Sequence, residues 1–216
     1  MKKKTIITTI LFLVFFSVSQ GQITHDKHGQ TDKTAIELLK RAVSKMQNVT
    51  FTTTMTALDS QKRQLSQQTA EVRYNKGRYH IIASDQELIC DGTTVWHWNK
   101  NAREVTVNDI PPANDINLLN PSGILASYET NFRAKYIRTE EDGTAIVDLQ
   151  AKTTRSFHKL RLRIDEKSGI LKRLEVHNYD SSREIYDFKK HKFNSIQDSF
   201  RFDTKSHPEV EVIDMR

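Results

Sequence analysis

The sequence predicts a mainly β protein of the α+β class, in which a single antiparallel sheet is curled into an unclosed half-barrel. An N-terminal helix and a helical lid insert are expected to cap it. Three observations support this fold class: one helical repeat near the start, a long series of strand-like runs, and an apolar insert broken by prolines. A two-layer sandwich would leave the helices no sheet face to cover, whereas a curved sheet offers them one. With 216 residues, the chain is expected to form one domain.

The helix is predicted from Thr34 to Met46, because apolar residues recur there every three or four positions. Thr34 and Glu37 have the spacing of a capping box, which favours a helix start at this point. The apolar positions are Ala35, Ile36, Leu38, Leu39, Ala42, Val43 and Met46.

β-structure is predicted from Val49 onward, where the apolar period changes to two. The residues that share one face of this first strand are Val49, Phe51, Thr53, Met55 and Ala57. Further strand-like runs follow at 69–75, 78–84, 86–91, 94–99, 103–108, 132–138, 144–150, 157–164, 170–178 and 183–193. Glycines at 77, 92, 143 and 169 separate paired runs, as hairpin turns with positive φ require. The runs therefore predict an antiparallel meander.

The insert interrupts the strands at about residues 109–131 and contains Pro111, Pro112 and Pro121. Its apolar residues are Ile116, Leu118, Leu119, Ile124, Leu125 and Tyr128. Two short helices separated by Pro121 are expected here, and helices of this length need packing against the sheet to be stable.

The first 21 residues have the pattern of a secretory signal peptide. Three lysines at positions 2–4 precede an apolar run from Ile6 to Val18 that is shorter than the roughly 20 residues of a membrane span. We therefore expect residues 1–21 to be removed and residues 22–216 to form a single domain. Because no cysteine stands near the cleavage point to carry an acyl anchor, we expect a soluble protein of the periplasm.

The charge balance argues against a nucleic-acid partner. Without the three leader lysines, 30 basic residues face 27 acidic ones, so the net charge falls from +6 to +3. Residues 152–192 hold twelve Lys or Arg and six Asp or Glu, but the basic residues alternate along predicted strands. A solvated basic sheet face is favoured over nucleic-acid binding, which an exported protein would rarely meet.

The residues offer little sign of an enzyme or a metal protein. Cys90 is the single cysteine and stands on an apolar strand, which is typical of a small buried hydrophobe. His25 and His28 form the one close histidine pair, on a polar segment without a helix to align them. No nucleophile elbow, zinc-protease or phosphate-loop motif occurs. A hydrolase that uses dispersed acids such as Asp85, Asp91 and Asp109 stays open, because catalytic groups meet in space.

A half-barrel with an apolar concave face is a place where a hydrophobic ligand can be buried. The periodicity is equally compatible with a packed core that leaves no room for a guest. From strand parity and the insert, the expected lipid-binding residues are Phe51, Met55, Tyr79, Ile81, Leu88, Trp96, Trp98, Leu118, Leu119, Leu125 and Tyr128. Trp96 and Trp98 share one face of their strand, and either a guest or the core would account for them.

The chain resembles the outer-membrane lipoprotein carrier family of LolA type. The resemblance is carried by residues 77–81 (GRYHI), residues 86–99 (QELICDGTTVWHWN) and residues 103–107 (REVTV). They follow the family's order: a strand with a basic-aromatic pair, a strand, an Asp-Gly turn, a strand with a tryptophan-x-aromatic pattern, and a Val-Thr strand. Asn120-Pro121 and Leu125 fall where the family has a proline-containing lid helix. The leader, first helix and length also agree.

This resemblance implies an unclosed β-barrel with a helical lid that acts as a periplasmic carrier rather than an enzyme. It implies that the chain shields the acyl chains of lipoproteins between the two membranes, as a monomer and without a cofactor. The implied partners are acylated lipoproteins, an inner-membrane lipoprotein-releasing transporter and an outer-membrane acceptor. Asn75-Lys76-Gly77 stands where members often have an Arg-Pro pair, so an arginine contact to the lid is not expected. Related folds also serve as envelope-stress sensors, and fold likeness does not choose between the two roles.

Overall fold

The fold was analysed in a computed structural model, which describes residues 32–110, 128–153, 155–194 and 196–216. The helices are α1 (Lys33–Lys45) and α3 (Tyr128–Asn131). The strands are β1 (Asn48–Leu58), β2 (Gln64–Asn75), β3 (Arg78–Ile82), β4 (Gln86–Cys90), β5 (Thr94–Asn99), β6 (Glu104–Asp109), β7 (Phe132–Thr139), β8 (Thr144–Ala151), β9 (Phe157–Asp165), β10 (Leu171–Asn178), β11 (Arg183–Phe193) and β12 (Glu211–Asp214).

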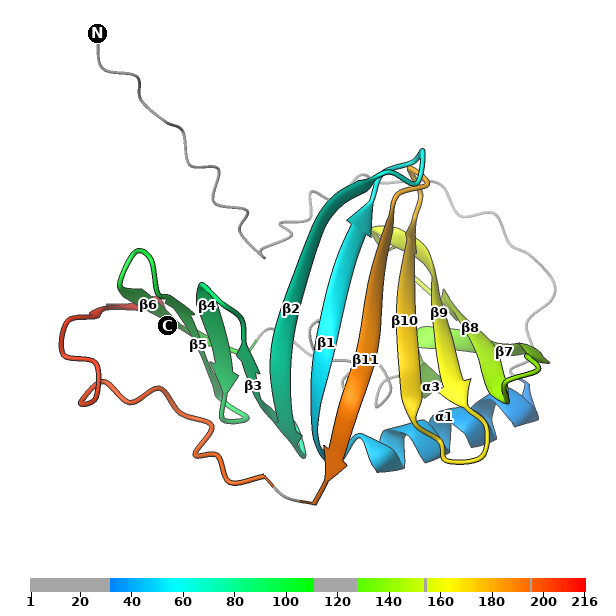
Figure 1. Cartoon of the computed structure of the whole chain (residues 1–216), viewed down its shortest axis with the longest axis horizontal. Helices are drawn as coiled ribbons and strands as arrows, with labels where there is room; N and C mark the ends of the chain where they lie inside the picture. The colour runs from blue at the N-terminus through cyan, green and yellow to red at the C-terminus, as the bar shows by residue number, and fades with distance from the viewer. Residues whose placement is uncertain (1–31, 111–127, 154, 195) are drawn as a thin grey trace, which may run out of the picture.

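All strands of the described chain belong to one sheet, in the order β12-β6-β5-β4-β3-β2-β1-β11-β10-β9-β8-β7. Figure 1 shows this sheet as a curled surface whose two ends, β12 and β7, are not joined. The prediction of a mainly β fold with one unclosed, curled sheet and few helices is therefore confirmed.

The chain path differs from a simple meander. The first half runs outward from β1 to β6, and the second half starts at the opposite edge with β7 and returns to pair β11 with β1. Strands β6 and β7 follow one another in this part of the sequence, and yet β7 is one edge of the sheet and β6 lies next to the other edge, β12. A tight hairpin turn forces adjacent pairing, whereas the long segment between these two strands does not.

Each of the predicted strand runs overlaps an observed strand, and among the strands of the described residues the sequence pattern missed only β12. This short strand pairs with β6 in parallel, next to antiparallel pairs everywhere else in the sheet. The run predicted at 69–75 is the second part of β2, which begins earlier at Gln64. The four hairpin glycines all have positive φ, as predicted.

Helix α1 begins two residues earlier than the capping box suggested. Its N-cap is Asp32, whose side-chain oxygen accepts hydrogen bonds from the backbone N–H of Thr34 at 2.8 Å and of Ala35 at 3.4 Å. The backbone N–H of Asp32 also donates to the carbonyl of Ala134 in β7, at 3.2 Å. These bonds fix the start of the helix against the sheet.

The face of the sheet that α1 covers is called the inner face here, and the opposite one the outer face. The buried residues of α1 are Ala35, Leu38, Leu39 and Ala42, and they join the main hydrophobic core on the inner face. In Figure 1, α1 crosses one end of the sheet near β8–β10, whereas β3–β6 lie away from it. Helix α1 therefore fills the inner face on the β7–β11 side and leaves the β3–β6 side to other groups.

Segments 1–31 and 111–127 lie outside the described residues, and with them the predicted signal peptide and most of the lid insert. Within the described part of the chain, neither helix is long and apolar enough to cross a lipid bilayer.

Candidate functional site

A row of side chains runs along the inner face beyond α1. The backbone register pairs Phe51 with Val72, Val72 with Ile81, Ile81 with Leu88 and Leu88 with His97, so one row crosses five strands from β1 to β5. Directly paired residues of adjacent strands share a face. The predicted residues Phe51, Ile81 and Leu88 are therefore brought together on the inner face.

A second row lies beside the first and includes the predicted residue Tyr79. Tyr79 pairs with Tyr74 on β2 and with Cys90 on β4. Cys90 is fully buried, and burial raises the pKa of its thiol, so it packs as a small hydrophobe as the sequence suggested. This row lies deep, since Tyr79 keeps only 5% of its surface exposed.

The predicted residues differ in depth along the inner face. Phe51 is buried, with an exposure of 2%, and its ring meets that of Phe188 edge to face at 5.4 Å. Met55, Ile81 and Leu88 are only half-buried and pack against the rim of the core. Ile81 and Leu88 are directly paired, and Met55 lies four residues further along β1 than their row. These three partly exposed residues are together called the incompletely covered apolar patch of the inner face.

Trp96 and Trp98 lie on the outer face, which corrects their predicted place beside Leu88 and Tyr79. Trp96 pairs with Ile89 and Val107, residues of the opposite parity to Leu88. Strand β5 is apolar on both faces, since Val95 packs into the inner core and Trp96 into a separate outer cluster. A period of two cannot assign the faces of such a strand.

The outer cluster is covered by residues 196–210, called the C-terminal strap below. The members of the outer cluster are Ile89, Trp96, Val105, Val107 and Phe202, with Trp98 and Val210 packed against them. The ring of Trp98 lies 5.4 Å from that of Phe202 and 4.5 Å from that of His207. The tryptophans therefore hold the strap to the sheet, a role that the sequence pattern did not indicate.

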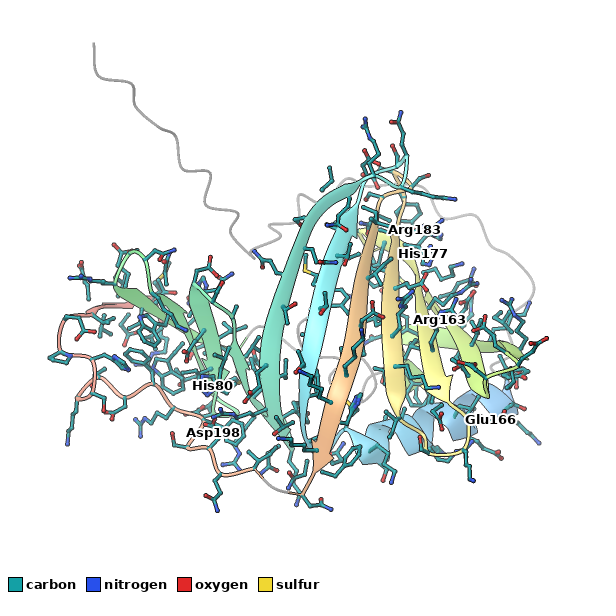
Figure 2. All side chains as sticks on the ribbon, viewed as in Figure 1. His80, Arg163, Glu166, His177, Arg183 and Asp198 are labelled. Carbon is teal, nitrogen blue, oxygen red and sulfur yellow. The ribbon has the colours of Figure 1, made fainter. Side chains whose placement is uncertain are left out.

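His80 fixes the other end of the strap. Its Nδ1 lies 2.9 Å from an Asp198 carboxylate oxygen, and its Nε2 lies 2.7 Å from an oxygen of Glu87 on β4. Figure 2 shows His80 and Asp198 side by side. Burial alone lowers the pKa of His80, but hydrogen bonds and charge from Glu87 and Asp198 outweigh it, so the net pKa is raised.

Arg78 and Arg73 add further contacts between the sheet and the strap. The guanidinium of Arg78 lies 4.9 Å from the centroid of the Phe200 ring, a cation–π contact. Arg73 Nη1 lies 3.1 Å from Asp198. The basic residue of the Arg78-Tyr79 pair therefore faces the strap, while the aromatic residue faces the inner core.

Tyr128 is the predicted lid residue that the structure describes. It begins α3 and packs into the inner core with 4% of its surface exposed. Its hydroxyl donates to Glu129 at 2.9 Å, and burial together with this carboxylate raises the pKa of Tyr128 to about 12. Leu118, Leu119 and Leu125 lie outside the described residues.

Two buried polar atoms interrupt the inner face near Met55. Thr53 Oγ1 and Gln68 Oε1 are inaccessible to solvent, and neither has a hydrogen-bond partner in the described chain. The register pairs Gln68 with Met55 and Thr53 with Ala70. Thr53 was expected on this face, but Gln68 was missed because the predicted strand began after it.

The outer face of β8–β11 carries the basic stretch found in the sequence. Arg161 binds Asp148 with two hydrogen bonds of 2.7 and 2.8 Å, and Arg173 binds Asp187 with two of 2.6 and 2.9 Å. Figure 2 shows Arg163, His177 and Arg183 on these strands, far from His80. Several of the basic residues are thus paired along a sheet face, which agrees with the solvated-face interpretation.

Of the acids considered for a hydrolase, Asp91 has a structural role in a turn. Asp91 accepts hydrogen bonds of 2.8 Å from the backbone N–H groups of Thr93 and Thr94, which closes the β4–β5 turn. Asp109 ends β6 with its side chain exposed. In the described ranges, no group of three His, Cys, Asp or Glu residues is arranged to hold a metal ion.

The chain is similar to several solved structures at low sequence identity. An uncharacterized conserved protein from Thermus thermophilus is 10% identical with a TM-score of 0.57, covering 84% of this chain and 99% of its own. A LolA superfamily protein from Nitrosomonas europaea is 9% identical with a TM-score of 0.43, covering 81% and 100%. In the MucA/MucB complex of Pseudomonas aeruginosa, the matching chain is 13% identical with a TM-score of 0.48, covering 79% and 62%. The likeness to the Thermus thermophilus protein shows a shared fold and says nothing about function.

Among curated proteins, no significant match to this chain is found. The family model described as outer membrane lipoprotein carrier protein LolA matches residues 72–205, which is more than half of the chain. This segment contains most of the inner-face rows described above and the part of the strap that holds Asp198 and Phe202. The chain therefore belongs to the LolA family of outer membrane lipoprotein carrier proteins, a family of lipid-binding or carrier proteins of the bacterial envelope.

Proposed function

We propose that this chain is a periplasmic carrier that binds the acyl chains of lipoproteins on the inner face of its sheet. The bound lipoprotein would be received from an inner-membrane lipoprotein-releasing transporter and passed to an outer-membrane acceptor. In this proposal residues 1–21 direct export, residues 22–216 form the single working domain, and the protein acts as a soluble monomer. Family membership supports a carrier or binding role rather than catalysis.

The observation that carries the proposal is the incompletely covered apolar patch of Met55, Ile81 and Leu88. Helix α1 covers the inner face on the β7–β11 side, but these three residues lie on β1, β3 and β4 and keep part of their surface open. An acyl chain that lies along this patch would remove its remaining apolar surface from water. Such burial contributes about 25 cal/mol for each Å².

A carrier must also release its cargo, which limits how completely the chains are buried. Two chains of about fifteen methylenes each would gain roughly 24 kcal/mol at about 0.8 kcal/mol per methylene. This exceeds the practical limit of about 21 kcal/mol for non-covalent binding. A patch at the rim of a packed core suits the task, because it dries only part of each chain and leaves the complex reversible.

The test is a pair of substitutions at adjacent positions of β1. Met55→Glu places a charge on the inner face, while Thr56→Glu places the same charge on the outer face, next to Gln67 of β2. We expect Met55→Glu to weaken binding of a fluorescent fatty-acyl probe by about tenfold or more, because the charge would be buried against the chain. Thr56→Glu should change the affinity by less than about twofold. Equal affinities for the two variants would contradict the proposed site.

The lid residues Leu118, Leu119 and Leu125 are proposed to cover the bound chain. Leu118→Glu should weaken probe uptake while the protein stays folded, as checked by circular dichroism. If the insert is only structural, the same substitution should unfold the protein and leave no folded variant with weakened uptake.

A sensor that detects lipids or lipoproteins with the same site is the alternative. Deletion of the gene distinguishes the two roles, because loss of a carrier strands lipoproteins at the inner membrane. Loss of a sensor changes the envelope-stress response and leaves lipoproteins correctly placed.

A further inference from the structure

The inner face holds a polar pair in the middle of its apolar surface. Thr53 lies on β1 between Ala70 of β2 and Phe188 of β11, and Gln68 lies on β2 directly opposite Met55. Thr53 and Gln68 are therefore diagonal neighbours across two strands. In antiparallel sheets such neighbours lie roughly 7–8 Å apart.

Both members of the pair lack a partner, although several other polar side chains of the same region have one. On the outer face, Thr54 Oγ1 lies 3.2 Å from Thr69 Oγ1, and Gln67 Nε2 donates to Thr56 at 3.1 Å. On the inner face next to the pair, the Tyr186 hydroxyl donates to Glu184 at 2.8 Å. Thr53 Oγ1 and Gln68 Oε1 are buried and unpaired in the described chain. Buried polar groups in folded proteins nearly always have a partner, so this exception needs an explanation.

The chemistry of the pair fits one kind of linkage. A threonine hydroxyl can donate a hydrogen bond, and the side-chain oxygen of glutamine can accept one. A trans amide presents a carbonyl oxygen on one side and an N–H on the other. Placed between the two side chains, such an amide would accept a hydrogen bond from one and donate a hydrogen bond to the other.

We propose that Thr53 and Gln68 bind the amide group of an amide-linked fatty acyl chain, and that they distinguish it from an ester-linked chain. The Thr53 hydroxyl donates to the amide carbonyl, and Gln68 accepts from the amide N–H. The alkyl chain then lies on the neighbouring half-buried Met55. This inference rests on the proposed function, because it assigns a role within the same acyl-binding face.

The protein can discriminate between the two linkages because an ester lacks the N–H donor that an amide has. An ester carbonyl satisfies Thr53, but it leaves Gln68 buried and unpaired, and a buried acceptor without a partner costs free energy. Sites built to bind a donor group reject analogues that lack the group far more strongly than apolar pockets reject a change of size. The preference therefore depends on Gln68 more than on Thr53.

The experiment compares matched ligands as competitors of a fluorescent acyl probe. One pair is N-palmitoyl ethanolamine and its ester counterpart, and the other is an N-palmitoyl tripeptide and the corresponding O-palmitoyl tripeptide. For the unaltered protein we expect each amide to bind about tenfold more tightly than its ester. A preference confined to the tripeptide pair would identify acylated protein as the source of the amide, and a preference in both pairs would include free lipids.

The variants assign the preference to the pair. Gln68→Leu should reduce it to less than about twofold and leave ester binding unchanged or tighter, while Thr53→Val should weaken amide and ester alike. Gln67→Leu and Thr54→Val alter the same residue types on the outer face and should keep the tenfold preference. In the ligand-free protein, Gln68→Leu should raise the melting temperature, because it removes an unpaired buried acceptor.

The outcomes separate the two proposals. Equal binding of amide and ester by the unaltered protein overturns this inference and leaves the acyl-binding proposal in place. The same holds if Gln68→Leu keeps the preference, since a bound water would then satisfy the pair. Failure of the unaltered protein to bind any acyl probe overturns the proposed function and this inference with it.

Discussion

The two sides of the sheet are covered on opposite faces. On the β7–β11 side, α1 covers the inner face, and the outer face is a lattice of ion pairs such as Arg161–Asp148 and Arg173–Asp187. On the β3–β6 side, the C-terminal strap covers the outer face, and the inner face keeps the half-buried Ile81 and Leu88. Figure 1 shows the helix and the strap at opposite ends of the molecule.

This difference shows how one sheet provides both a packed core and an open face. Charged pairs on the outer face of β8–β11 are satisfied by one another and need no cover. The outer face of β4–β6 carries Trp96, Val105 and Val107, and such an apolar surface is stable in water only when something covers it. The strap supplies that cover without occupying the inner face, where Ile81 of β3 and Leu88 of β4 stay half-buried.

The largest expected effect concerns the helix-covered side. Leu39 has no exposed surface, so Leu39→Ala should lower the free energy of unfolding by about 2–5 kcal/mol. Chemical denaturation monitored by circular dichroism measures this change. Lys40→Ala, at the exposed neighbouring position, should change stability by no more than about 0.5 kcal/mol. A loss for Leu39→Ala as small as the control's would mean that α1 is not part of the main core.

The strap side should respond locally. Phe202→Ala removes the ring that packs against Trp98, and we expect the strap to detach at a cost of about 1–3 kcal/mol while the rest stays folded. Hydrogen exchange should show lost protection in the strap and in β12, with α1 unchanged. Thr204→Ala, at an exposed strap position, should alter neither. Equal loss of protection in α1 would show that the two sides unfold as one unit.

Two hairpin glycines provide a smaller test of the same contrast. Gly169 has φ +75°, and a Cβ atom there would lie 3.0 Å from Cβ of Arg41 in α1. Gly77 has φ +90° on the strap side, and a Cβ there would meet nothing within 4 Å. In both variants alanine must adopt a left-handed backbone conformation, which costs roughly 1–2 kcal/mol. Gly169→Ala also crowds the new Cβ atom against α1. Thermal unfolding should therefore rank Gly169→Ala as the less stable variant, and a reversed order would contradict the close packing of this turn on α1.

The smallest expected effect is the pH dependence of the strap. The pKa of His80 is raised above 6.5, so its contribution is complete below about pH 6.5 and is lost as the pH rises through the higher folded value. Burial acts to raise the pKa values of Glu87 and Asp198, but hydrogen bonds, including those from His80, outweigh it and hold them below 4.5 and 3.8. The contributions of these two carboxylates to stability are therefore lost only in stronger acid. The strap should be most protected between about pH 4.5 and 6.5.

Hydrogen exchange at pH 5.5 and 8.5, corrected for intrinsic rates, measures this dependence. The strap of the unaltered protein should lose protection at the higher pH. His80→Gln keeps a polar side chain but does not titrate, so its strap should show the same protection at both values. A strap that becomes more protected at pH 8.5 would contradict the role given to His80.

Much of the fold follows from local pattern. Helix α1 and the strands β1–β11 were all indicated by period and by turn residues, because hydrophobic periodicity and positive-φ glycines act within a few residues of the chain. The inner-face parity of Phe51, Met55, Tyr79, Ile81 and Leu88 also agrees with the pattern. In these strands the two faces differ in character, as in β1, where threonines alternate with apolar residues.

The pattern failed where both faces of a strand are apolar. In β5, Val95 faces the inner core and Trp96 the outer cluster, so no local feature states which face is which. The polar segment 196–210 gave no periodic signal, although Phe202 and Asp198 fix it to the sheet. Its contacts lie more than a hundred residues away in sequence, as the His80–Asp198 pair illustrates.

The sequence by itself thus determined the elements, their turns and the likeness to a lipoprotein carrier family. Only the tertiary structure decided that β1 pairs with β11, that the strap covers the tryptophans and that Thr53 and Gln68 stand unpaired beside Met55. The reason is that periodicity reports whether a side chain faces an apolar environment, whereas the identity of its neighbours depends on pairings between distant segments.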